Sequence, residues 1–119
     1  VLDYIACQFC LESNYGTSRF ATEFNNISGM KFPRSRPTTS YGFYVGSSYI
    51  AKYASWSACV VDYVYRCCYF KFVQSSFKSI DIFKSYLLKS NYCPESDYLN
   101  RIDNVYNFIT NLKNSQNEK

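Results

Sequence analysis

Six cysteines are the most distinctive chemical feature of this 119-residue chain: Cys7, Cys10, Cys59, Cys67, Cys68 and Cys93. An even number of cysteines in a short chain is typical of disulfide-bonded proteins of oxidising compartments. We therefore expect three disulfides. The neighbours Cys67 and Cys68 would diverge by about 100° on a helix, so each should pair with a different site. Sequence alone does not determine the pairing.

Two other uses of these thiols fit the sequence less well. A redox pair at Cys7 and Cys10 would need a helix that begins there after a strand, and few other cysteines. A structural zinc site would need a second close pair at suitable spacing, and the chain contains no histidine. We therefore predict no metal site and no cofactor.

Residues for general acid–base catalysis are scarce. The chain has no histidine, so the commonest general base, metal ligand and triad partner is missing. No glycine-rich phosphate loop or nucleophile elbow is present. A small enzyme that uses Glu95 and Asp97 is an alternative, but a helix that begins at Pro94 explains both acids. The sequence therefore predicts a protein that is not an enzyme.

Aromatic residues favour binding as the function. The chain has 13 tyrosines and 10 phenylalanines, too many for the core alone to accommodate every ring. Exposed tyrosine is a common contact residue at protein interfaces. A net charge of +4, spread along the chain, is too small for a nucleic-acid surface. The candidate binding surface combines loop tyrosines with the one local basic cluster: Tyr41, Tyr44, Tyr49, Lys31, Arg34 and Arg36.

The spacing of apolar residues predicts mainly helices. A short helix over residues 3–13 would place Cys7 and Cys10 on one face. Two prolines and two glycines predict a loop over residues 30–46. The other expected helices are one capped by Thr17 or Ser18 that ends near Gly29, a central one over residues 47–73, one around residues 80–88, and one that begins at Pro94.

The fold class depends on the central segment. Its apolar residues recur every three or four positions, which favours a helix, and Asp62 and Arg66 would form an i, i+4 pair. Residues 60–73 are also rich in β-branched and aromatic side chains, as strands are. We predict an all-α, disulfide-stapled bundle of four to five helices. The alternative is an α+β fold with residues 60–73 as a strand.

The chain is long enough for one domain, which we expect over residues 1–113, followed by a polar tail over residues 114–119. Val1 in place of methionine indicates processing or trimming, which fits a removed signal peptide and a secreted, extracellular protein. No apolar run is long enough for a transmembrane helix. The sequence Asn26-Ile27-Ser28 is a candidate glycosylation site at Asn26.

The cysteine pattern resembles one known family. Cys7, Cys10, Cys68 and Cys93 have spacings similar to those of saposin-like domains, which are small disulfide-bonded helical proteins. The tyrosine- and cysteine-rich composition is also similar to that of the secreted effectors of gall-forming aphids called bicycle proteins. The resemblance implies a secreted effector that binds a host or other partner protein. Its alternative implication is a lipid- or membrane-surface-binding protein.

Overall fold

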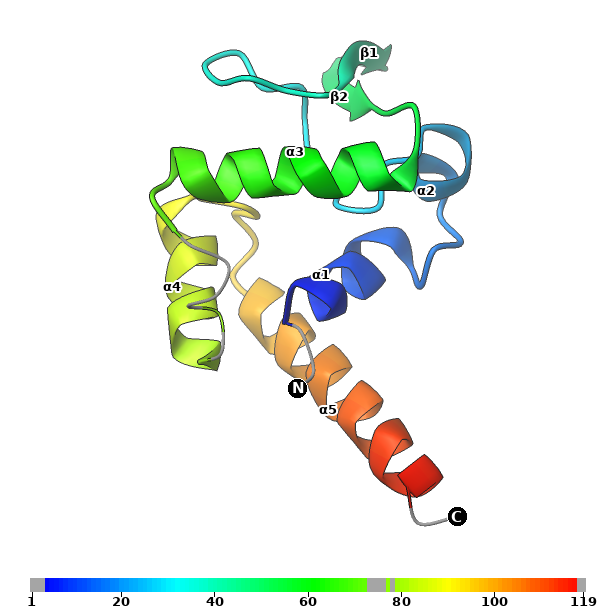
Figure 1. Cartoon of the computed structure of the whole chain (residues 1–119), viewed down its shortest axis with the longest axis vertical. Coiled ribbons are helices and arrows are strands. Elements are labelled where there is room, and N and C mark those ends of the chain that lie inside the picture. Colours follow the sequence, from blue (N-terminus) through cyan, green and yellow to red (C-terminus); the bar gives the residue numbers. More distant parts are fainter. Residues whose placement is uncertain (1–3, 73–76, 78, 118–119) are drawn as a thin grey trace.

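The computed structural model describes residues 4–72, 77 and 79–117. In this part the chain forms five helices and one two-stranded antiparallel sheet (Figure 1). In chain order the elements are α1 (Tyr4–Ser13), α2 (Arg19–Glu23), β1 (Tyr41–Val45), β2 (Ser48–Lys52), α3 (Trp56–Tyr69), α4 (Ile80–Lys89) and α5 (Tyr98–Asn117).

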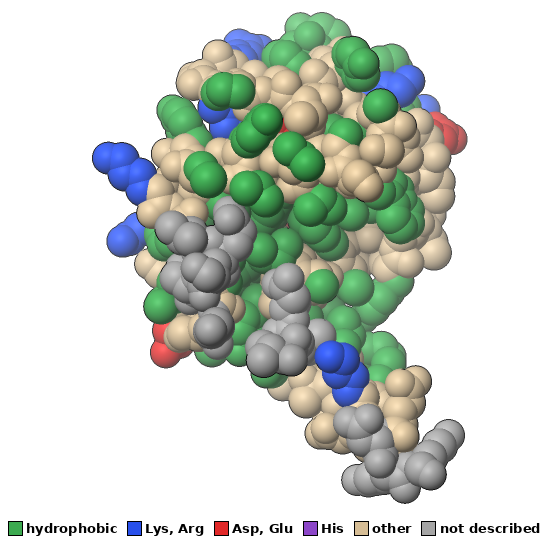
Figure 2. All heavy atoms as spheres, in the orientation of Figure 1, with side chains coloured by type: hydrophobic (Ala, Val, Ile, Leu, Met, Phe, Trp, Pro, Cys, Tyr) green, Lys and Arg blue, Asp and Glu red, His purple; other side chains and the backbone are tan. Residues whose placement is uncertain are grey.

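Helix α3 lies across the molecule, with the β1–β2 hairpin on one side and α1, α4 and α5 on the other (Figure 1). Helix α1 packs against α5. The C-terminal part of α5 extends beyond the rest of the structure, where Phe108 and Leu112 are exposed. Hydrophobic side chains are spread over the face shown in Figure 2 and do not form a single patch there.

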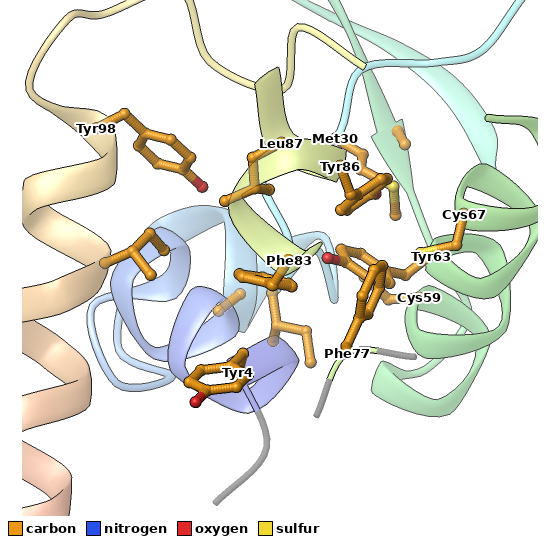
Figure 3. Close-up of a cluster of buried hydrophobic side chains, with 14 of the residues drawn as sticks. Tyr4, Met30, Cys59, Tyr63, Cys67, Phe77, Phe83, Tyr86, Leu87 and Tyr98 are labelled. Atoms are coloured by element: carbon orange, nitrogen blue, oxygen red, sulfur yellow. The ribbon is translucent and has the colours of Figure 1, made fainter. Parts of the chain in front are cut away.

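The core is built mainly from aromatic rings. Tyr63 from α3, Phe83 and Tyr86 from α4, and Phe77 before α4 pack together, with ring centroids 5.2–6.2 Å apart (Figure 3). Aromatic pairs at these separations and angles add to the free energy gained by burying their area. Many of the aromatic residues therefore stabilise the fold.

The central segment differs from the expected single helix over residues 47–73. Residues 48–52 form β2, and the helix begins only at Trp56. Gly46, with a φ of 60°, allows the tight turn that pairs β1 with β2, and the Tyr44 and Tyr49 rings stack across the hairpin with centroids 4.5 Å apart. The Ser55 side chain then caps α3 by accepting a hydrogen bond from the Ala58 N–H.

The fold is mostly helical with a small sheet, so the all-α description was incomplete and an α+β description fits. The strands, however, are residues 41–45 and 48–52. Of the proposed strand, residues 60–73, residues 60–69 belong to α3 and residues 70–72 follow it outside any strand. Val73 lies outside the described residues. Cross-strand aromatic pairing stabilises β1 and β2 as strands. Residues 56–69 are helical because a helix buries Cys59, Tyr63 and Cys67 on one face.

The prediction of three disulfides is wrong for this structure. None of the six cysteines, all of which lie in the described part of the chain, is joined in a disulfide. Cys7, Cys59 and Cys67 are fully buried in the core, where a thiol packs as a small hydrophobic group. Cys68 is exposed on the other side of α3. The aromatic core therefore takes the stabilising role that we assigned to disulfides.

Helix α4, at residues 80–89, lies where we expected it. Helix α5 spans residues 98–117 and begins four residues after Pro94, so Glu95 and Asp97 precede the helix and are not in its first turn. Helix α5 continues through Asn117, so residues 114–117 of the expected tail are helical. Among the described residues, no helix combines the length and the apolar character that a membrane span requires.

Candidate functional site

A cavity of about 600 Å³ opens between the end of α1, the loop after Gly29, the end of α3 and the segment before α5. Its walls carry four basic side chains, Lys31, Arg34, Arg36 and Arg66. Of the described residues that line it, Glu12 is the only acid. A cavity of this size accommodates a small ligand or part of a polymer, so its polar groups are the candidates for chemistry.

Glu12 lies in the last turn of α1 and is half-buried. The Tyr98 hydroxyl donates a hydrogen bond of 2.5 Å to its Oε1. Burial raises the pKa of the Glu12 carboxyl, whereas the Tyr98 hydrogen bond and the nearby charge of Arg101 act to lower it. The net shift is upward. A carboxyl with this pKa can hold a proton closer to neutral pH than an exposed glutamate can.

Gly29 packs directly against this carboxyl. A methyl group placed on Gly29 would overlap Glu12 Oε2 and lie 3.2 Å from its Cδ, and Gly29 has a φ of 73°. Both the space and the backbone angle therefore require glycine. Gly29 and Glu12 both line the cavity, so the contact between Gly29 and Oε2 is part of the cavity wall.

Asn26 holds the turn that carries Gly29. Its Oδ1 accepts a hydrogen bond of 2.9 Å from the Gly29 N–H, and its Nδ2 donates to the carbonyl oxygens of Met30 and Ala51, each at 2.9 Å. Asn26 is only 2% exposed. The structure thus gives a positioning role to the residue that we named as a glycosylation site, and its amide lies in the interior.

A buried ion pair anchors the basic loop to α3. The Arg36 guanidinium donates to Asp62 Oδ1 at 2.7 Å, and the Tyr53 hydroxyl donates to Asp62 Oδ2 at 2.5 Å. Lys31 and Arg34, on the same loop, are exposed at the cavity. This ion pair adds to the backbone hydrogen bonds that join residues 30–32 to β2. The loop is therefore fixed on both sides, while Lys31 and Arg34 stay exposed in the cavity that Glu12 also lines.

Helix α3 contributes Arg66 and Tyr69 to the cavity wall. Arg66 ties this wall to its neighbours. Its guanidinium lies 4.2 Å from the centroid of the Tyr92 ring and donates to the Tyr86 hydroxyl and to Ser90. The Tyr92 hydroxyl in turn donates to the Ser28 carbonyl oxygen at 2.7 Å. These contacts link α3 and the segment before α5 to the turn that carries Gly29.

The structure separates the predicted binding residues into two groups. Lys31, Arg34 and Arg36 line the cavity beside Glu12. Tyr41, Tyr44 and Tyr49 lie on the β1–β2 hairpin, outside the residues that line it. Tyr41 and Tyr44 are 65% and 63% exposed. Whether these tyrosines bind a partner stays a prediction.

The sequence analysis missed Glu12. One physical signal could have identified it. The carboxylate lies in the last turn of a largely apolar helix, where the helix dipole disfavours negative charge. An acid in such a place is unfavourable for stability and is therefore a candidate for function.

Comparisons with known proteins identify relatives of the chain. The family model "Glucosaminidase: Mannosyl-glycoprotein endo-beta-N-acetylglucosaminidase" matches residues 2–111. A solved "type VI secretion system effector-immunity complex from Pseudomonas protegens" contains a chain of similar fold, with a TM-score of 0.67 and 21% identity; the match covers 88% of this chain and 75% of that one. No curated protein sequence matches the chain.

These findings correct three of our expectations. Neither match is to a saposin-like domain or an aphid effector, so the resemblance based on cysteine spacing was misleading. The predicted non-enzymatic effector or ligand, and its lipid-binding alternative, are overturned by the match to a family of glycosidases. The prediction of no enzyme is wrong for the same reason. It rested on the absence of histidine, which glycosidases that use carboxylates do not need.

Proposed function

Because the chain belongs to the glucosaminidase family, we propose that it hydrolyses glycosidic bonds in an N-acetylhexosamine polymer, with Glu12 as the general acid. The Glu12 carboxyl is the observation that carries this proposal. It lines the cavity, and its pKa is raised by burial. In glycosidases a carboxylic acid with a raised pKa protonates the oxygen of the leaving sugar.

Glycosidases usually need a second group as nucleophile or base. Glu95 is close enough to raise the pKa of Glu12, but its carboxylate is exposed and forms an ion pair with Arg101. The described residues place no second carboxylate in the cavity wall. We infer that the N-acetyl group of the substrate takes this role, as it does in substrate-assisted glycosidases.

The charge of the cavity supports an anionic glycan as the substrate. Lys31 and Arg34 are exposed at the cavity, and neither forms an ion pair within the described part of the chain. Bacterial peptidoglycan is an N-acetylhexosamine polymer that carries carboxylates along its strands. We therefore propose peptidoglycan as the substrate, with these two residues near its carboxylates.

The structural neighbour supports a biological setting. That chain is part of a type VI secretion effector–immunity complex. By analogy we propose that this protein is exported as an effector against the cell wall and is neutralised by a protein partner. This analogy rests on similarity of fold, so it is part of the proposal.

The proposed function is tested by analysing the products from purified peptidoglycan. We expect new reducing ends on N-acetylglucosamine, detected by borohydride reduction and sugar analysis. Uncharged N-acetylglucosamine oligomers should be cleaved more slowly, since they lack the carboxylates that Lys31 and Arg34 would attract. New reducing ends on N-acetylmuramic acid, or none at all, would contradict the proposal.

Replacing Gly29 with alanine tests the geometry of the acid. The added methyl group would push Glu12 Oε2 out of place, so we expect kcat to fall at least about tenfold, because misplacement of a catalytic group is costly. Gly46→Ala is the matched control, since Gly46 has a φ of 60° and open space around it. Both variants should lose about 1–2 kcal/mol of stability from the left-handed backbone. Equal activities in an assay of reducing ends would show that the contact is unimportant.

A further inference from the structure

A chain of buried hydrogen bonds ends on Glu12. The Tyr63 hydroxyl of α3 donates to Oε1 of Gln8, on α1. Nε2 of Gln8 donates to the Tyr98 hydroxyl oxygen at 3.0 Å, and the Tyr98 hydroxyl donates to Glu12 Oε1 at 2.5 Å. Tyr63, Gln8 and Tyr98 are at most 3% exposed. Water therefore has little access to these groups, and their partners are fixed by the fold.

The direction of this chain follows from the amide of Gln8. An amide oxygen only accepts hydrogen bonds and an amide nitrogen only donates them. With its oxygen bonded to Tyr63, Gln8 presents its nitrogen to Tyr98, whose oxygen must then accept. The one proton of the Tyr98 hydroxyl is left to point at Glu12. Tyr98 and Tyr63 reach the interior from opposite sides, α5 and α3 (Figure 3).

The Glu12 oxygen that accepts the Tyr98 hydrogen bond, Oε1, cannot point a proton of its own at the Tyr98 hydroxyl. When Glu12 is neutral, its proton is therefore on Oε2. That oxygen lies beside Gly29, a residue of the cavity wall. We propose that Tyr98, oriented by Gln8 and Tyr63, is a positioning residue that keeps the proton of Glu12 on the oxygen facing the substrate. The inference rests on the proposed role of Glu12 as the general acid.

The same hydrogen bond also serves the second half of the transfer. After Glu12 has given its proton to the leaving oxygen, the ionised carboxylate is left in a half-buried site. The Tyr98 hydroxyl, already pointing at Oε1, stabilises that charge without reorientation. Removing this hydroxyl should therefore disfavour the ionised form of Glu12.

Other charged and titratable groups line the same cavity or act on the Glu12 charge, and the test must separate them from Tyr98. They come from the basic loop, from α3, from the segment before α5 and from α5: Lys31, Arg34, Arg36, Arg66, Tyr69, Tyr92, Cys93, Glu95 and Arg101. Arg101 is itself paired with Glu95 and Asp97. A Tyr98→Phe substitution leaves all these charges in place, so any shift it causes reports the hydroxyl.

The experiment is a carbon NMR titration of glutamate side-chain carboxyls in the full chain, with Glu12 assigned from the signal lost in Glu12→Gln. In Tyr98→Phe we expect the pKa of Glu12 to rise by about one to two units. The basic limb of the kcat profile should move to higher pH by the same amount, because a general acid works until it loses its proton. A group that only stabilised the fold would not move this limb.

Tyr53→Phe is the matched control. It removes another buried hydroxyl that donates to a carboxylate at 2.5 Å, that of Asp62, and it should leave the pKa of Glu12 unchanged. A second variant, Gln8→Met, keeps the Tyr98 hydroxyl but removes the donor that orients it. It should raise the pKa of Glu12 by a smaller amount, since the neutral acid could then donate to Tyr98.

The sign of the shift decides the question. If the pKa of Glu12 falls in Tyr98→Phe, Tyr98 accepts the proton of the neutral acid and the proposal is overturned. An unchanged pKa in both Tyr98→Phe and Gln8→Met overturns it as well. Because the titration does not require turnover, a shift without any glycan cleavage would refute the proposed function alone.

Discussion

Replacing Glu12 with glutamine is expected to lower kcat for glycan hydrolysis by about 10²–10⁴-fold, the usual contribution of general acid catalysis. Glutamine has the same shape and can still accept the Tyr98 hydrogen bond, but it has no proton to give to the leaving oxygen. The measurement is the rate of reducing-end release from peptidoglycan at saturating substrate. KM should change little, because the interaction that is lost belongs to the transition state.

The same variant should not be less stable. The folded-state pKa of Glu12 is raised, so the native protein holds this proton more tightly than the unfolded chain does. Stability therefore falls as pH rises from the unfolded to the folded pKa of this group and stays reduced above that window. Glutamine removes this loss, and Tm at neutral pH should be equal or higher.

Glu23→Gln is the control for Glu12→Gln, because Glu23 is an exposed acid on α2 that pairs with Arg19 away from the cavity. It should keep full activity. If Glu12→Gln retained more than about a tenth of the wild-type kcat, general acid catalysis by Glu12 would be excluded, since even a modest contribution exceeds this.

Helical periodicity predicted much of the fold. Four to five helices were expected, and α1, α4 and the helical part of the contested segment, α3, were predicted near their observed positions. Each depends on a local pattern of buried and exposed residues, which the sequence displays directly. Ser18, one of the two predicted caps, does cap α2: its side chain accepts a hydrogen bond from the Ala21 N–H. That helix, however, ends at Glu23 and does not continue to Gly29 as predicted.

The hairpin could not be predicted with the same rule. Its stability comes from pairs such as Tyr44 with Tyr49, which approach only when Gly46 turns the chain. The run of Tyr, Ile and Ala from Tyr49 also continues the helical spacing of α3, so a single helix over residues 47–73 fitted the pattern. The single glycine at the turn, Gly46, was a weaker signal than the helical spacing of the apolar residues, so the sequence favoured a helix over a hairpin.

The candidate site was predicted only in part. Lys31, Arg34 and Arg36 were recognised as a basic cluster, and they line the cavity. Glu12 was missed because its environment is made by distant parts of the chain, namely Gly29, Tyr98 and Arg101. The cysteines were overinterpreted, because their number suggested disulfides. In the structure Cys7, Cys59 and Cys67 are buried, the last two in a cluster with aromatic rings, and act as core residues.

The largest loss of stability is expected from Asp62→Asn. Asp62 is fully buried, and both of its oxygens accept hydrogen bonds, from Arg36 and from Tyr53. Asparagine leaves the Arg36 guanidinium, with its side chain only 6% exposed, without a counter-charge. Breaking a buried ion pair on one side costs about 3–5 kcal/mol, because the remaining charge is not solvated. Chemical denaturation with urea measures this difference directly.

The exposed ion pair of Arg19 with Glu23 is the matched comparison. Its donor–acceptor distance is 2.7 Å, the same as that of Arg36 with Asp62, but its side chains are 64% and 55% exposed against 6% and 0%. Glu23→Gln should therefore cost at most about 1 kcal/mol. Similar losses in the two variants would mean that water reaches Arg36. In that case the Arg36–Asp62 pair would contribute little to fixing the basic loop on α3, and the loop would depend on its other contacts, such as the hydrogen bond from the Thr39 hydroxyl to the Ala58 carbonyl oxygen.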